Sequence, residues 1–321
     1  MTGTVTFAVT AAPSGYDNTG SDMTAAGLYD PCILHTDIFI FNDDALRRID
    51  AYQRCYGGER AKAASRRGRK LLVAIANSSL KPEEWHRVSS YEGLLEEIAC
   101  LKDESSSYPL MSGTIRINPE QGYSYEIDME RLVSEICIRS IRADFSGSAY
   151  EGKPLTDVKI YLTNVNAACR IMKDSGFRPE MIVNPGFLDI DALYGFKDRS
   201  MLYAELEDDV RTASIHPDIR LFCYPNDSRE ETPGSPFTRL VIEGRIDGYR
   251  YWYPITVNRG DSGIASGGDG NGIGRNCRYV YDITLYRTGT DDPDKPVSKS
   301  EVGIVCNVLP WDEKDNVEMT F

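Results

Sequence analysis

Apolar and polar residues alternate at the start of the chain, which predicts a β-strand there. Between residues 4 and 11, the side chains of Val5, Phe7 and Val9 fall on one face, and threonines occupy most of the other. Such a period of two is typical of a strand with one buried face. We expect this segment to be a retained first strand, held in the first domain by these three apolar side chains.

The next segments predict two core strands and a helix. Residues 38–41 and 71–76 are continuous apolar runs that end at turn-forming residues, which is typical of strands inside a β-sandwich. Ser89 and Glu92 then have the spacing of a capping box, and leucine and isoleucine residues recur at helical intervals up to Leu101. We expect one amphipathic helix in this part of the chain.

Strand-like segments recur along the rest of the sequence. They lie at residues 114–117, 123–127, 132–145, 158–165, 219–224, 240–245, 249–257, 279–286 and 302–308. Turn-rich segments separate them, and strands do not alternate with helices as they do in parallel α/β proteins. The pattern predicts a mainly β protein, built from antiparallel β-sandwich domains with a few short helices.

The length of the chain predicts two domains. A chain of 321 residues exceeds what one hydrophobic core usually organises, so about two domains of ~150 residues each are expected. Residues 146–154 combine glycine, serine and proline in the manner of a linker. We therefore place the domains at residues 1–148 and 149–321.

Composition narrows the range of functions. The formal net charge of −13 repels a phosphate backbone, and no basic stripe offsets it, so the sequence argues against nucleic acid as a partner. We interpret the basic cluster at residues 66–70 as a solvated loop ahead of a strand. No segment has the ~20 apolar residues that span a bilayer, and no charged and apolar leader opens the sequence. This start fits a chain from which an export signal has been removed.

The eight cysteines do not suggest metal or redox chemistry. None of them forms a C-x-x-C pair, which disfavours zinc ribbons and thioredoxin-like sites. Cys137, Cys223 and Cys306 lie in strand-like runs, and we expect them to be unpaired thiols that fill the core. Cys32 and Cys55 lie in loop-like sequence, where pairing between them stays open.

Candidate catalytic chemistry is sparse. The three histidines, His35, His86 and His216, are far apart in sequence, and neither G-x-S-x-G nor a Walker A motif occurs. We therefore predict no catalytic residue, no metal site and no cofactor, and we expect that the protein is not an enzyme. The glycine-rich residues 267–274 are interpreted as a hairpin loop, because calcium-binding β-roll repeats form sites only when stacked.

An aromatic segment offers one candidate binding surface. Tyr251 and Trp252 lie within the run of residues 249–253 and would suit the stacking of sugar rings. The alternative is that alternating aromatic residues of a strand face the core and its rim. Both interpretations stay open from the sequence.

The C-terminal part carries a resemblance to a known family. Arg275-Asn276 precedes Tyr279 at the entry to a strand, residues 288–297 form a G-T-x-x-P-x-x-P type of turn, and a further strand leads to Trp311. This succession resembles the ending of the Bacteroidetes fimbrillin superfamily. Three earlier segments agree in order with the same family, at residues 71–77, 110–113 and 129–138.

The resemblance implies a fold and a function. Fimbrillins have two transthyretin-like β-sandwich domains, are exported as lipoproteins and build type V pili at the cell surface by donor-strand exchange. The implied partners are other pilus subunits. The implied location is extracytoplasmic, at the cell surface, with attachment to the outer membrane or to the fimbria. Membrane contact would come only through an N-terminal lipid that this sequence does not contain.

Two departures from the family pattern affect the role within a pilus. The lipobox cysteine is not seen, and no arginine or lysine lies between Ala12 and Ile38, where an arginine-specific protease would release the first strand of a stalk subunit. The first basic residue is Arg47. An anchor or accessory subunit that keeps its first strand is therefore a serious interpretation. The alternatives are a tip adhesin, with a ligand on a host or bacterial surface, and a glycan-binding surface lipoprotein.

The last residues of the chain also have a strand pattern. Val317, Met319 and Phe321 alternate with polar residues after a polar connection at 312–316. This segment is a candidate C-terminal donor strand that enters a neighbouring subunit. A terminal strand of the protein's own second domain would have the same alternation, so both alternatives stay open.

Overall fold

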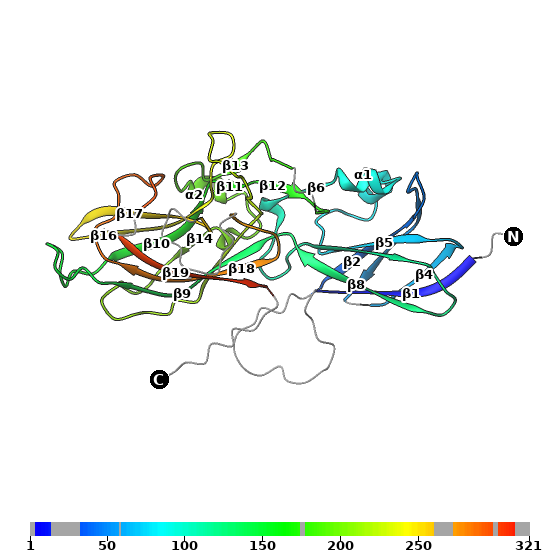
Figure 1. The fold of residues 1–321 in the computed structure, drawn as a ribbon, viewed down its shortest axis with the longest axis horizontal. Helices are drawn as coiled ribbons and strands as arrows, with labels where there is room; N and C mark the ends of the chain where they lie inside the picture. The colour runs from blue at the N-terminus through cyan, green and yellow to red at the C-terminus, as the bar shows by residue number, and fades with distance from the viewer. Residues whose placement is uncertain are drawn as a thin grey trace.

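The computed structural model describes residues 4–13, 33–57, 59–173, 177–259, 272–297 and 301–311. Figure 1 shows an elongated molecule, with the N-terminal strands at one end and the C-terminal strands at the other. The prediction of a mainly β fold with few short helices is confirmed. None of the described helices is long and apolar enough to cross a lipid bilayer.

The first half is built from one seven-stranded sheet with the order β3-β2-β5-β7-β8-β1-β4. Its strands are β1 (Thr4–Pro13), β2 (His35–Asn42), β3 (Ile49–Tyr56), β4 (Ala61–Arg66), β5 (Lys70–Ala76), β7 (Met111–Ile117) and β8 (Ser124–Arg131). β7 and β8 pair over only two positions, and side chains of β1 share a core with those of β2 and β5. The sheet therefore folds over into two layers around that core.

The second half contains two four-stranded sheets, with the orders β14-β10-β16-β17 and β15-β9-β18-β19. Their strands are β9 (Ser134–Ala143), β10 (Thr156–Thr163), β14 (Tyr203–Glu205), β15 (Ile219–Cys223), β16 (Arg239–Ile246), β17 (Tyr249–Thr256), β18 (Cys277–Leu285) and β19 (Val302–Pro310). Side chains of both sheets belong to one core. Two pairs are parallel rather than antiparallel, β1 with β8 and β9 with β18.

Short elements cover the region between and above the sheets (Figure 1). They are α1 (Tyr91–Leu95), α2 (Ile190–Leu193), β6 (Ile98–Cys100), β11 (Val165–Asn166), β12 (Ala168–Arg170), β13 (Ile182–Val183) and the 3₁₀ helices Glu84–Arg87, Leu101–Asp103 and Arg199–Met201. The segment around α1 packs on the outer side of β2 and β5, because Trp85 and Leu94 share a core with Phe39 and Val73. Both faces of β2 and β5 are thus buried, which explains their continuous apolar runs.

The predicted helix is shorter than its periodicity suggested. Ser90, not Ser89, caps α1, since its Oγ accepts a hydrogen bond from the Gly93 N–H at 3.2 Å. The helix ends at Leu95, and residues 98–100 form β6, which pairs with β12 of the second half. Pairing with a distant segment therefore overrides the helical spacing of the apolar residues.

The chain crosses between the two sets of sheets earlier than the predicted boundary after residue 148. β8 ends at Arg131, and β9 already pairs with β15 and β18 of the second half. The crossing residues Leu132 and Val133 are apolar and fully buried. Residues 146–154 instead lie in the connection from β9 to β10, where breaker residues make turns rather than a linker.

The basic cluster and the cysteines also differ in part from expectation. Lys70 begins β5 and is buried, with its Nζ 2.9 Å from a carboxylate oxygen of Asp50.

Cys137, Cys223 and Cys306 are free thiols, but only the last two lie in the core, while Cys137 is half-buried on the outer face of its sheet. Cys55, expected in a loop, is a buried free thiol of β3.

Candidate strand-exchange site

β1 occupies an apolar slot in the first half of the molecule. Val5, Phe7 and Val9 are 5%, 2% and 1% exposed, whereas Thr4 and Thr6 face solvent. The Phe7 ring meets the ring of Tyr125 edge to face, with the ring centroids 5.6 Å apart. The period of two in the sequence thus corresponds to one buried and one open face of this strand.

The backbone of β1 is paired along both of its edges. Residues 4–9 run antiparallel to β4, and residues 8–13 run parallel to β8. Without β1, unpaired N–H and C=O groups of β4 and β8 would flank an apolar floor that includes Ile38, Ile40 and Leu72. A slot of this kind can be filled by any strand with suitable alternation, which is the physical basis of strand exchange.

The first basic residue of the sequence lies beyond the next core strand. Arg47 follows β2, and β2 is an internal strand between β3 and β5. A cut at Arg47 would therefore separate β2 as well as β1 from the rest of the sheet.

The candidate donor residues Val317, Met319 and Phe321 lie outside the described residues. The described chain ends close to the junction of the two halves, just after β19 (Figure 1). There the ring of Trp311 stacks on Phe222 at 5.8 Å, and the guanidinium of Arg131, at the end of β8, lies 4.8 Å from the Trp311 ring.

Tyr251 and Trp252 lie on opposite faces of β17, since they are consecutive residues of a strand. The Tyr251 hydroxyl is 3.3 Å from that of Tyr150, and its ring packs against the core. Trp252 instead donates a hydrogen bond from Nε1 to Glu243 at 3.2 Å on the outer face of the sheet. The two rings therefore do not form one aromatic platform.

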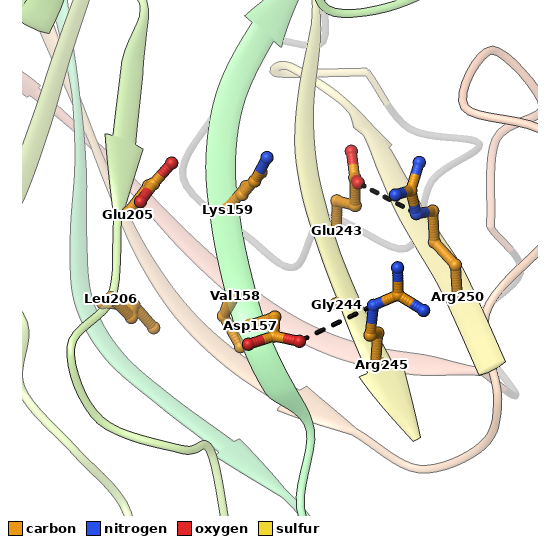
Figure 2. A pocket seen from close by; sticks show the side chains of 9 residues that line it. All are labelled: Asp157, Val158, Lys159, Glu205, Leu206, Glu243, Gly244, Arg245 and Arg250. Atoms are coloured by element: carbon orange, nitrogen blue, oxygen red, sulfur yellow. Dashed lines mark ion pairs between the residues drawn. The ribbon is translucent and has the colours of Figure 1, made fainter. Parts of the chain in front are cut away.

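A depression on this outer face is lined mainly by charged side chains from β10, β14, β16 and β17 (Figure 2). Arg245 pairs with Asp157 at 3.6 Å and Arg250 with Glu243 at 3.4 Å. Lys159 stands between Glu205 and Glu243 in the strand register. Opposite charges thus balance one another across the depression, as on a solvated sheet face.

The described residues hold no group of three or more His, Cys, Asp and Glu side chains that could bind a metal ion. His35 contacts the backbone oxygen of Ser78, and burial beside Arg54 lowers its pKa. His86 packs edge to face on Tyr52, and His216 contacts the backbone oxygen of Arg139.

No family model matches the chain. A candidate cell adhesion protein from Parabacteroides distasonis has a similar structure, with a TM-score of 0.67 and 17% identity over 96% of this chain and 97% of that one. The fimbrilin FimA of Porphyromonas gingivalis W83 matches with a TM-score of 0.66 and 14% identity over 96% and 97%. The tip fimbrial protein Mfa3 of P. gingivalis, with a C-terminal truncation, matches with 0.60 and 11% over 96% and 100%.

The chain has the fimbrillin fold. The resemblance expected from the sequence is thereby confirmed at the level of the fold.

The turn at residues 288–297, which contributed to the resemblance, packs against neighbouring strands in this fimbrillin fold. Thr290 exchanges two backbone hydrogen bonds with Trp252, at 2.8 and 3.0 Å, so this segment lies against β17. A side chain at Gly289 would collide with the Trp252 carbonyl, which explains the glycine. Asp294 then accepts hydrogen bonds from Asn164, which directly follows β10, and from Arg239 of β16. The motif could be found in the sequence, but its partners could not.

Gly113 has a similar explanation in the fimbrillin fold. It lies in β7, within the segment 110–113 that contributed to the resemblance, and a Cβ there would collide with the backbone oxygen of Asp128 in β8. A glycine allows these two backbones to approach closely where the sheet folds over.

Proposed function

We propose that this protein is a structural subunit of a cell-surface type V pilus, a member of the fimbrillin superfamily that joins its neighbours by donor-strand exchange. The observation that carries the proposal is the internal position of β1, which is buried on one face and paired along both edges. Its partners are other pilus subunits, and its location is the cell surface, with an N-terminal lipid as the expected link to the outer membrane. No enzymatic role is proposed.

The C-terminal sequence supports the proposal. Val317, Met319 and Phe321 repeat the i, i+2, i+4 spacing of Val5, Phe7 and Val9. A strand with this spacing places three apolar side chains on one face, as the slot requires. The same segment is therefore suited to fill the slot of a neighbouring subunit.

Removing residues 317–321 tests the donor role. Under donor-strand exchange the shortened subunit keeps the melting temperature of the full chain but no longer enters pili, so polymer ladders lose this subunit. If the segment instead belongs to the protein's own core, its removal lowers the melting temperature by several degrees. A folded mutant that still assembles fully would refute the donor role.

Within this function, we favour an anchor or accessory subunit that keeps its first strand. No arginine or lysine lies between Ala12 and Ile38, and a cut at Arg47 would remove the internal strand β2 together with β1. The mass of the subunit recovered from pili checks this choice. We expect a chain that still contains Val5, whereas a chain that starts at Arg48 would show a processed stalk subunit.

A tip adhesin is the second candidate. The observation in its favour is that the tip fimbrial protein Mfa3 shares the fold over 96% of the chain.

The glycan-binding alternative loses its main support, because Tyr251 and Trp252 face opposite sides of β17. A glycan panel separates these functions, since saturable binding that is lost on substitution of Trp252 would restore the glycan-binding alternative.

A further inference from the structure

The two halves of the molecule meet along a seam of backbone hydrogen bonds. β6 of the first half pairs with β12 of the second, as the central part of Figure 1 shows. The pairing continues beyond the strands, where Leu101 N–H donates to Ala167 at 2.9 Å and Ile171 N–H donates to Glu97 at 3.0 Å. A single core also contains side chains of both halves.

Arg275 lies across this seam, just before β18. Its Nη1 donates to the backbone oxygen of Ile171 at 3.0 Å, and its Nη2 donates to Ser112 Oγ of β7 at 2.6 Å. Ser112 Oγ in turn donates to the same oxygen of Ile171 at 2.7 Å, which closes a ring of three hydrogen bonds. The backbone oxygen of Glu130 in β8 lies 3.5 Å from Nη2.

The oxygens that accept hydrogen bonds from Arg275 are neutral, and its Nε atom is buried without a hydrogen-bond partner. Burial lowers the pKa of Arg275. The nearby carboxyl groups of Glu130 and Glu104 offset part of this cost, and the hydrogen bonds of the two Nη atoms satisfy donors that would otherwise be buried unpaired. The forked guanidinium meets this need, because it donates to both halves in a geometry that a lysine cannot reproduce.

Asn276 extends the contact to the end of β8. Its φ of 56° is in the left-handed region, which asparagine tolerates better than most residues. Its Oδ1 accepts hydrogen bonds from the backbone N–H and from Nη1 of Arg131, both at 3.2 Å. β8 is also the strand that pairs with β1, so this contact lies at the end of the β1 slot.

We propose that Arg275 is a positioning residue that locks the second half against β7 and β8, so that the two halves move and unfold as one body. The lock does not depend on strand exchange. In a chain under tension it would hold the β1 slot and β18 in one orientation.

The variant Arg275→Met tests the lock, because methionine keeps much of the apolar stem but no donor. We expect the full chain to unfold in a single calorimetric transition and the variant to unfold in two. We also expect hydrogen exchange at the amides of β6 and β12 to become at least about tenfold faster, the factor that 1.4 kcal/mol of lost protection gives. The control Arg245→Met lies on the outer face in Figure 2 and should leave both readouts unchanged.

The alternative is that Arg275 only adds stability. One cooperative transition at a lower temperature, with exchange at β6 and β12 unchanged, would overturn the lock. If Arg275→Met does not fold, Ser112→Ala removes the serine hydroxyl from the ring of hydrogen bonds without removing a charge. We then expect faster exchange at β6 and β12 alone, and an unchanged exchange pattern would refute the proposal.

Discussion

Glu104 lies buried between the two halves. Its carboxylate accepts hydrogen bonds from the Tyr224 hydroxyl at 2.8 Å and from the Leu110 N–H at 3.0 Å. Burial raises the pKa of Glu104 above its ordinary value of 4.5, and these hydrogen bonds offset only part of that effect. The folded state therefore keeps the proton of Glu104 more tightly than the unfolded state does.

This difference predicts a pH dependence of stability. Below pH 4.5 both states are protonated at Glu104, and as the pH rises the unfolded state loses its proton first, so the folded state loses stability. Glu104→Gln removes this titration. We therefore expect the melting temperature of the variant minus that of the unsubstituted chain to increase from pH 4.5 to pH 8. If this difference is constant over the same range, the pKa of Glu104 is not raised in the folded state.

Single residues also show what the sequence could not reveal. Arg275 and Asn276 were recognisable as a motif, but their hydrogen bonds reach Ser112 and Arg131, more than a hundred positions away. The burial of Lys70 depends in the same way on Asp50 across the sheet. Such partners are set by strand order, which residue spacing does not encode.

At the scale of elements, prediction succeeded where a strand has a simple environment. β1 has one buried face and was visible as alternation, while β2 and β5 have two buried faces and were visible as apolar runs. β4 was missed, because small and charged residues from Ala61 to Arg66 give little contrast. That β1 is internal, and parallel to β8, followed only from the topology.

The buried face of β1 gives a matched pair of substitutions. Phe7→Ala removes a ring that is 2% exposed and should lower the free energy of unfolding by about 3–5 kcal/mol. Thr6→Ala changes the exposed face of the same strand and should cost less than about 1 kcal/mol. Denaturant titration of both variants checks the difference. Equal effects would mean that β1 is not held by its apolar face.

At the scale of the whole molecule, the two halves are less separate than length and linker composition suggested. The crossing at Leu132 and Val133 is buried, and one core extends through both halves. A rule that searches for glycine, serine and proline finds exposed turns such as residues 146–154, but it cannot find a boundary that lies inside a core.

β1 begins at the outer end of the first half, and β19 ends near the junction (Figure 1). β1 and the end of the described chain therefore lie at different places along the molecule (Figure 1).

The central claim is that the C-terminal segment is a donor strand for a slot of the kind that β1 fills, and peptide complementation of a protein without β1 tests it most directly. A protein that starts at Gly27 lacks β1 and should melt below the full chain, since burying Val5, Phe7 and Val9 contributes on the order of 5 kcal/mol. We expect a synthetic peptide of residues 311–321 to bind this protein with 1:1 stoichiometry in calorimetry and to raise its melting temperature. The same peptide with serine at positions 317, 319 and 321 should do neither, and the full chain should bind neither peptide. A shortened protein that melts like the full chain, or that folds but does not bind the peptide, would contradict the claim.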